Sequence, residues 1–376
     1  MSSIAFAALQ QPHVTLGRVD QAQVLFIGEP RRVLGGLRGI ATGVVHGVRL
    51  RAQVSEHVVA AARGAFVAQR IDVNRGDDDP LASVLPTFAP ASRRKLQDIL
   101  RAPGFSGRIP SANVKDLVAS EQKTVAALMV GLLPLARTFS HPPISNYRVG
   151  TVARGASGDL YLGFNIEIPG QALGFAVHGE QAALSSAYMH GEQGISAIAL
   201  TAAPCGHCRQ FMNEISPDGE IEILVEGGAP MKLSALLPMA FGPKDLGRKE
   251  GAFPVRETKF KSASANSDPV AKAAIEAAGK SYAPYSQSHS GVAIRSKSGH
   301  IYLGSYIENV AFNPSLSPLQ TALVQMILAG EGYGAISRVV LAESTTAKIS
   351  QKFATEAVAS AIAAGIRVET VSVLAT

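Results

Sequence analysis

Four residues in two short segments have the types and spacing needed for metal-assisted hydrolysis. His178 and Glu180 form an H-x-E pattern, and Cys205 and Cys208 form a P-C-x-x-C pattern 25 to 30 residues later. One imidazole and two thiolates can hold a zinc ion and leave its fourth tetrahedral position open for water. A glutamate two residues from the histidine can carry protons beside that water. The pattern predicts a hydrolytic zinc site with Glu180 as the proton carrier.

The elements expected around these residues place the metal ligands at helix starts. Residues 180–190 have apolar side chains at helical spacing, residues 198–204 are typical of a strand, and a second helix is predicted from Cys205. Two cysteines three residues apart then share one face of that helix. The helix dipoles favour thiolate over thiol, because a helix N-terminus stabilises negative charge.

The C-x-x-C also allows two other interpretations. His207 could be a fourth ligand, but a closed site would leave no position for water, so this ring is expected to be turned aside. The sequence PCGHC also resembles the redox dithiol of thioredoxin-like proteins, which usually carry an aromatic residue, often Trp, before the first cysteine. The chain has no Trp, and a dithiol leaves H-x-E unexplained. A reversible disulfide without zinc would favour the redox interpretation.

An internal duplication is the second organising feature. Residues 145–167 align with residues 286–308 at a constant offset of 141, and both segments are typical of two strands joined by a Ser-Gly turn. When the same offset is added to the numbers of His178, Glu180, Cys205 and Cys208, the corresponding residues of the second copy are, in order, Leu319, Thr321, Thr346 and Ile349. Only the first copy is therefore expected to be catalytic.

Composition limits the class of protein. The 376 residues allow two or three domains, and 47% hydrophobic residues are enough for a sizeable core. The most apolar stretch, residues 124–136, is too short for a membrane helix and contains Pro134. Both cysteines lie in the C-x-x-C, which argues against a secreted, disulfide-stapled protein. A cytoplasmic location and no membrane partner are expected.

The first 76 residues differ in charge from the rest. Nine arginines against four acidic residues give them +5 of the formal +6, so the main body is not a basic nucleic-acid binder by charge. An Arg-rich, acid-poor start is also found in organellar transit peptides, although this one holds only three serines. An organellar location therefore stays open as the alternative.

Residues from about 77 to 376 resemble the homodimeric, two-domain cytidine deaminases of bacterial type. The stretches that carry the resemblance include LLPLARTFSHPPISNYRVG (132–150), VHGEQAALSSAYMHGEQ (177–193), PCGHCRQFMNE (204–214) and YLGSYIENVAFNPSLSPLQTALV (302–324). H-x-E followed by P-C-x-x-C is the known signature of zinc deaminases of nucleobases. The resemblance implies an α/β fold, a three-layer α/β/α domain that is duplicated after a small helical domain.

The resemblance also implies an organisation into parts and subunits. The expected parts are an Arg-rich extension, disordered or targeting (1–76), a small helical domain (77–124), a catalytic domain (125–250), a linker (251–267) and a non-catalytic copy (268–376). The family implies a homodimer whose active sites are completed across the subunit interface.

The family's functional residues carry over onto matching positions of this sequence. His178, Cys205 and Cys208 match the zinc ligands, and Glu180 matches the proton shuttle. Gly179 stands where the family usually has alanine, and its backbone N–H is the group that the family uses toward the base.

Five further residues match the family's substrate pocket. Asn165 and Glu167 match a pair that binds the ribose 3′-hydroxyl, which an amide and a carboxylate can do together. Tyr147 stands where a phenylalanine packs on the pyrimidine, Phe241 matches a second aromatic wall, and Phe312 of the second copy reaches toward the partner's site. For these aromatic residues, ordinary core packing is the alternative.

The function expected is hydrolytic deamination of cytidine and 2′-deoxycytidine in pyrimidine salvage, with a hydroxide on Zn²⁺ and Glu180 as proton shuttle. A nucleoside is the expected partner, and nucleic acid is not. Two alternatives remain: a deaminase acting on RNA or on modified cytosine nucleosides, and a non-catalytic family member. Against the first, a 3′-hydroxyl held by Asn165 and Glu167 leaves little room for a continuing phosphate. Against the second, the four chemical residues are intact.

Overall fold

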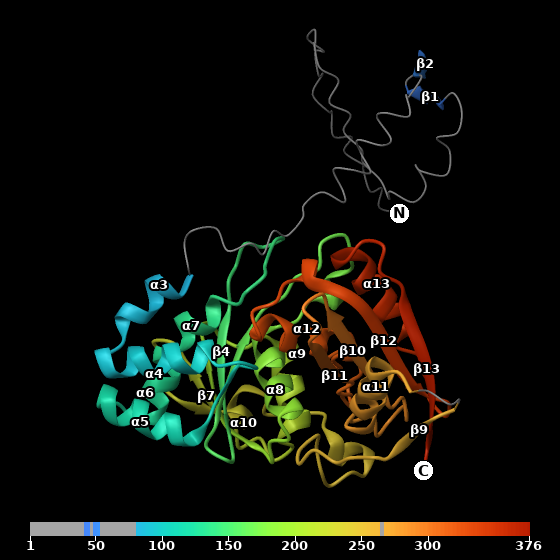
Figure 1. Cartoon of the computed structure of the whole chain (residues 1–376). Coiled ribbons are helices and arrows are strands. Elements are labelled where there is room, and N and C mark those ends of the chain that lie inside the picture. The colour runs from blue at the N-terminus through green and yellow to red at the C-terminus, as the bar shows by residue number, and fades with distance from the viewer. Residues whose placement is uncertain (1–40, 46–47, 53–79, 264–266) are drawn as a thin grey trace, which may run out of the picture. The chain divides into compact units, whose positions relative to one another are not determined.

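The computed structural model describes residues 41–45, 48–52, 80–263 and 267–376 (Figure 1). The chain divides into two compact units, Met1–Phe66 and Val67–Thr376. In the first unit, β1 (Ala41–Val45) and β2 (Val48–Ala52) pair as an antiparallel hairpin. The remainder of the predicted Arg-rich extension lies outside the described residues.

Short helices open the described part of the second unit, where a small helical domain (77–124) is expected. They are α3 (Pro80–Val84), the 3-10 helix η1 (Leu85–Thr87), α4 (Pro90–Arg101) and α5 (Ser111–Glu121). The short strand β3 (Arg108–Ile109) lies between α4 and α5 and joins the first sheet by pairing with β5. This pairing connects the helical segment to the first copy.

The first sheet has six strands in the order β3-β5-β4-β6-β7-β8. The strands after β3 are β4 (Gly150–Gly155), β5 (Leu160–Phe164), β6 (Ile195–Leu200), β7 (Glu222–Val225) and β8 (Met231–Lys232). The helices of this copy are α6 (Val125–Gly131), α7 (Leu133–Arg137), η2 (Leu173–Phe175), α8 (Gly179–Met189), α9 (Gly206–Ile215), α10 (Leu233–Leu236) and η3 (Pro243–Leu246). Only the β6–β7 pair is parallel among the pairs of this sheet.

The second sheet has five strands in the order β11-β10-β12-β13-β9. They are β9 (Phe260–Ser262), β10 (Ser290–Ser296), β11 (Ile301–Ser305), β12 (Ile336–Ser344) and β13 (Val368–Ala375). The helices are α11 (Pro269–Gly279), α12 (Pro318–Leu328), η4 (Tyr333–Ala335) and α13 (Lys352–Ile362). Strand β9 lies within the segment predicted as a linker and pairs with β13 at the sheet edge.

Helices cover both faces of the first sheet. A Cβ built on Gly150 of β4 would meet α7 at Leu133 and Arg137, whereas the next residue, Thr151, contacts Gly179 of α8. Neighbouring residues of a strand point to opposite faces, so α7 and α8 lie on opposite sides of the sheet. This is the predicted three-layer α/β/α arrangement, and it occurs in two copies.

The helices α8 and α12 contact each other in the middle of the second unit (Figure 1). Nearly every residue of both helices is buried. One continuous apolar core runs through both copies around them. A helix that is buried on all sides needs no polar face, which explains why apolar and small residues occur all around α8.

The predicted helix at 180–190 is confirmed as α8, and the helix predicted from Cys205 is confirmed as α9. The strand predicted at 198–204 is displaced, because β6 ends at Leu200. Residues 201–204 instead form the turn that carries the chain to the cysteines. Among the described residues, no helix has the length and apolar character to cross a membrane.

The strands of the two copies correspond at the predicted offset of 141. Gly150 pairs with Phe164 in the first copy, and Gly291 pairs with Ser305 in the second. Both Ser-Gly turns are confirmed by left-handed glycines that follow the first strand, with φ of 86° and 93° in the first and second copies. The left-handed conformation favours glycine, which is why both turns keep it.

The central helices correspond at a different offset. His178 caps α8 and Ser317 caps α12, 139 residues later, because the connection from strand to helix is two residues shorter in the second copy. The prediction that His178 and Glu180 correspond to Leu319 and Thr321 is therefore wrong. Their counterparts are Ser317 and Leu319. The conclusion that the second copy lacks these ligands is unchanged.

Candidate metal centre

The three predicted metal ligands lie together. The ligand atoms of His178, Cys205 and Cys208 are all within 4.8 Å of one another, and Nδ1 of His178 is 3.5 Å from Sγ of Cys205. Zn–S bonds of about 2.3 Å and Zn–N bonds of about 2.0 Å put neighbouring ligand atoms of a tetrahedral site about 3.5 to 3.8 Å apart. The measured separation and the donor set therefore fit a zinc ion.

Two helix N-termini position these ligands. His178 and Cys205 have extended backbones and occupy the cap positions of α8 and α9. Cys208 lies in the first turn of α9 and is buried, whereas Cys205 is exposed. Both helices thus direct unpaired backbone N–H groups and positive dipole ends toward the cluster, which favours thiolate ligands.

Hydrogen bonds within the cluster separate the acidities of the two cysteines. The Cys208 thiol donates to Cys205, and together with His178 it lowers the pKa of Cys205 to about 3. The same bond raises the pKa of Cys208. The bond with Cys205 also raises the pKa of His178. The cluster is thus arranged to hold negative charge on sulfur, as a metal cation requires.

Glu180 lies beside the ligands in the first turn of α8. Its side chain is only 6% exposed, and burial raises its pKa despite a hydrogen bond with Cys208 and the charge of His178. A buried carboxyl group with a raised pKa holds a proton more readily than an exposed one, which suits a group that must both accept and release protons. The geometry therefore suits Glu180 for the predicted proton transfer.

Gln181 is a contact residue that the sequence did not reveal. Its Oε1 accepts from the N–H of His178 at 3.2 Å, and its Nε2 lies 3.2 Å from Nε2 of His207 and donates to Pro314 O at 3.1 Å. The His207 ring stacks on His178 with centroids 5.2 Å apart and is not part of the ligand cluster. Gln181 therefore links the ligand helix to the second copy.

A second link joins the second copy to α9. Glu214 is fully buried at the end of α9 and accepts from the hydroxyls of Tyr282 and Tyr285 at 2.7 Å each and from Val310 N at 2.8 Å. Burial raises the pKa of Glu214 against the effect of these hydrogen bonds. The non-catalytic copy thus braces the helix that carries both cysteines.

Asn165 and Glu167 hold the loop at residues 144–149. Asn165 accepts from Val149 N at 3.0 Å and donates to Tyr147 O at 2.9 Å. Glu167 accepts from the backbone N–H groups of Ile144 and Ser145 and from the Ser145 hydroxyl, at 2.5 to 2.9 Å. Both predicted ribose-binding side chains therefore also support the loop that carries Tyr147.

The three predicted aromatic pocket residues are exposed. Tyr147, Phe241 and Phe312 are 56%, 49% and 66% accessible, so the core-packing alternative is wrong for all three. The side chains of Gln210 and Asn213 on α9 donate to Phe241 O. Large exposed aromatic side chains are available to a ligand or to a second subunit.

Comparison with known proteins identifies the family. Two models for the cytidine and deoxycytidylate deaminase zinc-binding region match residues 123–221 and 233–356. A cytidine deaminase of Shewanella sp. (strain MR-7) is 45% identical over 65% of this chain and 82% of that protein. A cytidine deaminase of Vibrio vulnificus (strain YJ016) is 43% identical over 72% and 90%. This chain belongs to the cytidine deaminase family.

The solved structures give a partial match. The crystal structure of cytidine deaminase from Mycobacterium tuberculosis is 28% identical and covers 31% of this chain and 96% of that chain, with a TM-score of 0.29. As a member of the cytidine deaminase family, this chain is a zinc-dependent hydrolase of duplicated α/β architecture. The second zinc-region match covers the copy that lacks the His, Cys, Cys cluster.

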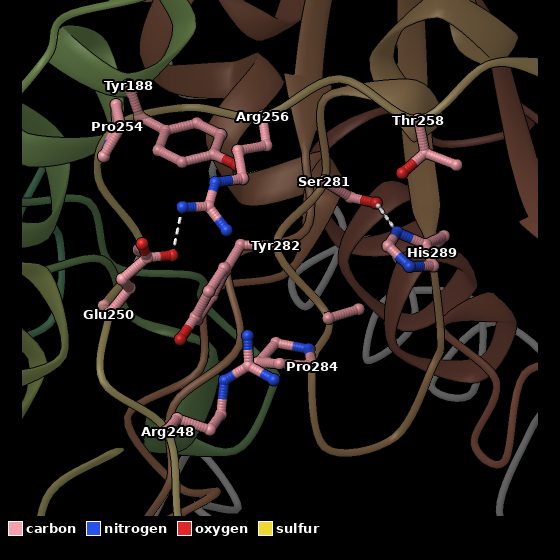
Figure 2. Close-up of a pocket in the computed structure, with 13 residues that line it drawn as sticks. Tyr188, Arg248, Glu250, Pro254, Arg256, Thr258, Ser281, Tyr282, Pro284 and His289 are labelled. Carbon is pink, nitrogen blue, oxygen red and sulfur yellow. Dashed lines mark hydrogen bonds and ion pairs between the residues drawn. The ribbon is translucent and has the colours of Figure 1, made fainter. Parts of the chain in front are cut away.

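A separate hollow of about 210 Å³ lies between the segment at residues 248–258 and the second copy (Figure 2). In it Glu250 pairs with Arg256, and Ser281 with His289 (Figure 2). None of its lining residues is a metal ligand or a predicted substrate residue of the deaminase. It is therefore distinct from the metal centre.

Proposed function

We propose that this chain hydrolyses cytidine and 2′-deoxycytidine to uridine and 2′-deoxyuridine, with release of ammonia, in pyrimidine salvage. The observation that carries the proposal is the meeting of His178, Cys205 and Cys208 beside the buried carboxyl group of Glu180. The similarity to proteins named cytidine deaminase supports the choice of substrate.

In the proposed mechanism, His178, Cys205 and Cys208 would hold a zinc ion, which would supply the positive charge that makes water acidic near neutral pH. Glu180 takes a proton from the attacking water and gives a proton to the ring nitrogen beside the reacting carbon. Glu180 then takes the remaining proton from the new hydroxyl group on that carbon and delivers it to the amino group. The C–N bond breaks, ammonia leaves and a carbonyl oxygen remains. The position of this buried carboxyl group beside the three ligands supports both proton transfers.

We assign the substrate contacts to the residues that the resemblance indicates. Asn165 and Glu167 bind the ribose 3′-hydroxyl, and the backbone N–H of Gly179 faces the base. Tyr147 and Phe241 flank the pyrimidine. The exposure of both aromatic side chains and the firm anchoring of the loop at 144–149 support this assignment.

Glu180→Gln tests the proton-transfer role with little change of shape. We expect turnover of cytidine to fall by at least about 100-fold, the size of a general acid–base contribution, while one zinc ion per chain is kept. The matched control is Glu356→Gln, which changes an exposed carboxyl group of α13 and should leave turnover unchanged. Retained turnover in Glu180→Gln would refute the role of Glu180.

We also propose a homodimer in which Phe312 contributes to the partner's site. Support comes from exposed apolar side chains, which include Leu173, Met239, Phe241 and Phe312. Mixing Glu180→Gln with Phe312→Ala chains tests it, because mixed dimers should recover turnover at one site. A monomer in light scattering, or no recovery on mixing, would contradict it.

We propose that the chain is divided into an extension (1–76), a helical domain (77–124), a catalytic domain (125–250), a linker (251–267) and a non-catalytic copy (268–376). The cytoplasmic location, the organellar alternative and the absence of a nucleic-acid partner stay predictions. RNA binding that weakens with salt and disappears on deletion of residues 1–76 would contradict the last of these.

A further inference from the structure

Gly179 separates the ligand His178 from Glu180 at the first position of α8. It is not among the glycines with positive φ, so its backbone conformation does not demand glycine. The lack of space at this position does require glycine. A Cβ here would lie 2.5 Å from Oγ1 of Thr151 and 2.8 Å from Cγ1 of Val149. Real Cβ atoms do not approach other atoms so closely, so any side chain here would displace a neighbour.

Thr151 is the firmer of these two neighbours. It is fully buried on β4, with Gly163 of β5 and Leu200 of β6 as its partners in the adjoining strands. A β-branched side chain on a central strand has few alternative rotamers. Its hydroxyl therefore occupies a fixed place directly below the first turn of α8.

The Thr151 hydroxyl has no hydrogen-bond partner among the described residues. A buried hydroxyl without a partner lowers stability, because it loses the hydrogen bonds that it makes with water in the unfolded chain. The contact that the structure shows for this hydroxyl is steric, because Thr151 Oγ1 fills the space that a methyl group on Gly179 would take.

Val149 extends the contact to the substrate loop. It is half-buried, its N–H donates to Asn165 Oδ1 at 3.0 Å, and its carbonyl accepts from Ser140 Oγ at 2.7 Å. A side chain on residue 179 would therefore press on the same segment that carries Tyr147. The spacing between α8 and this loop depends on the absence of a Cβ.

We propose that Thr151 is a positioning residue whose hydroxyl, together with the bare Cα of Gly179, sets the height of the first turn of α8 above β4. This turn carries Glu180 and the backbone N–H of Gly179, so the pair fixes both groups relative to the base. The inference rests on the proposed roles of these two groups. It predicts that residues 151 and 179 are coupled in size.

Three variants test this coupling by kcat, KM, zinc content and thermal unfolding. Gly179→Ala should lower kcat by about 10- to 100-fold, as expected for a displacement of about 1 Å, with one zinc still bound. Thr151→Ala/Gly179→Ala should recover most of the lost kcat and the lost Tm, because the new methyl group takes the vacated space. Thr151→Val/Gly179→Ala is the matched control and should stay impaired, because valine keeps the bulk of threonine.

Wild-type kcat in Gly179→Ala, or equal recovery in the alanine and valine double variants, would overturn the inference. If Gly179→Ala does not fold, a folded and zinc-loaded Thr151→Ala/Gly179→Ala supports the coupling, and an unfolded one overturns it. A wild-type chain that does not deaminate cytidine would instead refute the proposed function, while the coupling in Tm would still be measurable without substrate.

Discussion

The two copies share a framework and differ in chemistry. In both, a glycine of the second strand lets the central helix approach the sheet: a Cβ on Gly163 would meet α8, and a Cβ on Gly304 would meet α12, at 2.1 to 2.4 Å. In both, a glutamate at the strand end accepts backbone N–H bonds from the preceding loop, Glu167 in the first and Glu308 in the second. The two copies therefore share the contacts that hold helix, sheet and loop together. Among the described residues, only the first copy has the cluster of metal ligands.

The comparison also separates the two roles of Glu167. Its counterpart Glu308 keeps the loop contacts in a copy without metal ligands, and it is fully buried. Holding the loop is therefore a structural role that the two copies share. The contact of Glu167 with substrate would be an addition to that role.

Among the variants that test the difference between the two copies, Cys208→Ser should have the largest effect. Removal of the buried thiolate leaves two ligands, so we expect loss of zinc and of all measurable turnover. A control in the second copy is Ser344→Ala, which removes an Oγ from the end of β12 and should leave the zinc content unchanged. Metal analysis of both purified variants checks this, and a fully loaded Cys208→Ser chain would remove Cys208 from the ligand set.

Glu214→Ala should have the next largest effect, because it removes the hydrogen bonds that join α9 to the second copy. Two tyrosine hydroxyls and the Val310 N–H would lose their buried acceptor, and we expect the free energy of unfolding to fall by about 3 to 5 kcal/mol. Denaturant unfolding measures it, with Glu356→Ala as the exposed control. A loss below about 1 kcal/mol would mean that the copies are held together by other contacts.

Glu214→Gln tests the same brace through pH. Because burial raises the folded-state pKa of Glu214, its stabilising contribution is complete below its ordinary pKa of 4.5 and is lost as the pH rises through the folded pKa. Glutamine does not titrate. The wild type should therefore lose stability relative to Glu214→Gln as the pH rises above 4.5, in unfolding curves taken over increasing pH. A constant difference would show that the pKa of Glu214 is not raised.

A reciprocal pair of glutamines gives the smallest and most selective test. Gln181 of α8 donates to Pro314 O of the second copy, and Gln320 of α12 donates to Phe175 O of the first. Each also accepts from the N–H of its own helix cap, at 3.2 Å in both cases. The two side chains therefore make the same structural contacts from opposite directions.

Gln181→Ala and Gln320→Ala should cost similar stability, about 1 to 3 kcal/mol each. Only Gln181→Ala should also lower kcat, by about 10-fold, because its amide group contacts the backbone of the ligand His178 and the ring of His207. Thermal unfolding and steady-state kinetics on the same samples check both parts. Equal losses of activity would show that the contact to the second copy, and not the link to His178, is what matters.

The metal centre was the part most accessible to sequence reasoning. The types and spacing of His178, Glu180, Cys205 and Cys208 define one chemistry, and each lies at a helix start that local patterns also predict. The strands were equally visible, because period-two alternation and Ser-Gly turns are local signals.

Contacts between distant segments were not accessible. The two-residue shortening before α12 is missed when one fixed offset is carried along the chain, and it displaced the correspondence of His178 from Leu319 to Ser317. The bond from Gln181 to Pro314 joins residues 133 positions apart. The crowding of Gly179 by Thr151 exists only once β4 and α8 are packed together.

Anomalous scattering at the zinc absorption edge, from crystals of the full chain, tests the central claim most directly. The account predicts one strong peak per chain, within bonding distance of Nδ1 or Nε2 of His178 and of both cysteine sulfurs. A chain with no such peak, or with a second peak of equal strength in the copy from residue 268 to 376, would contradict it.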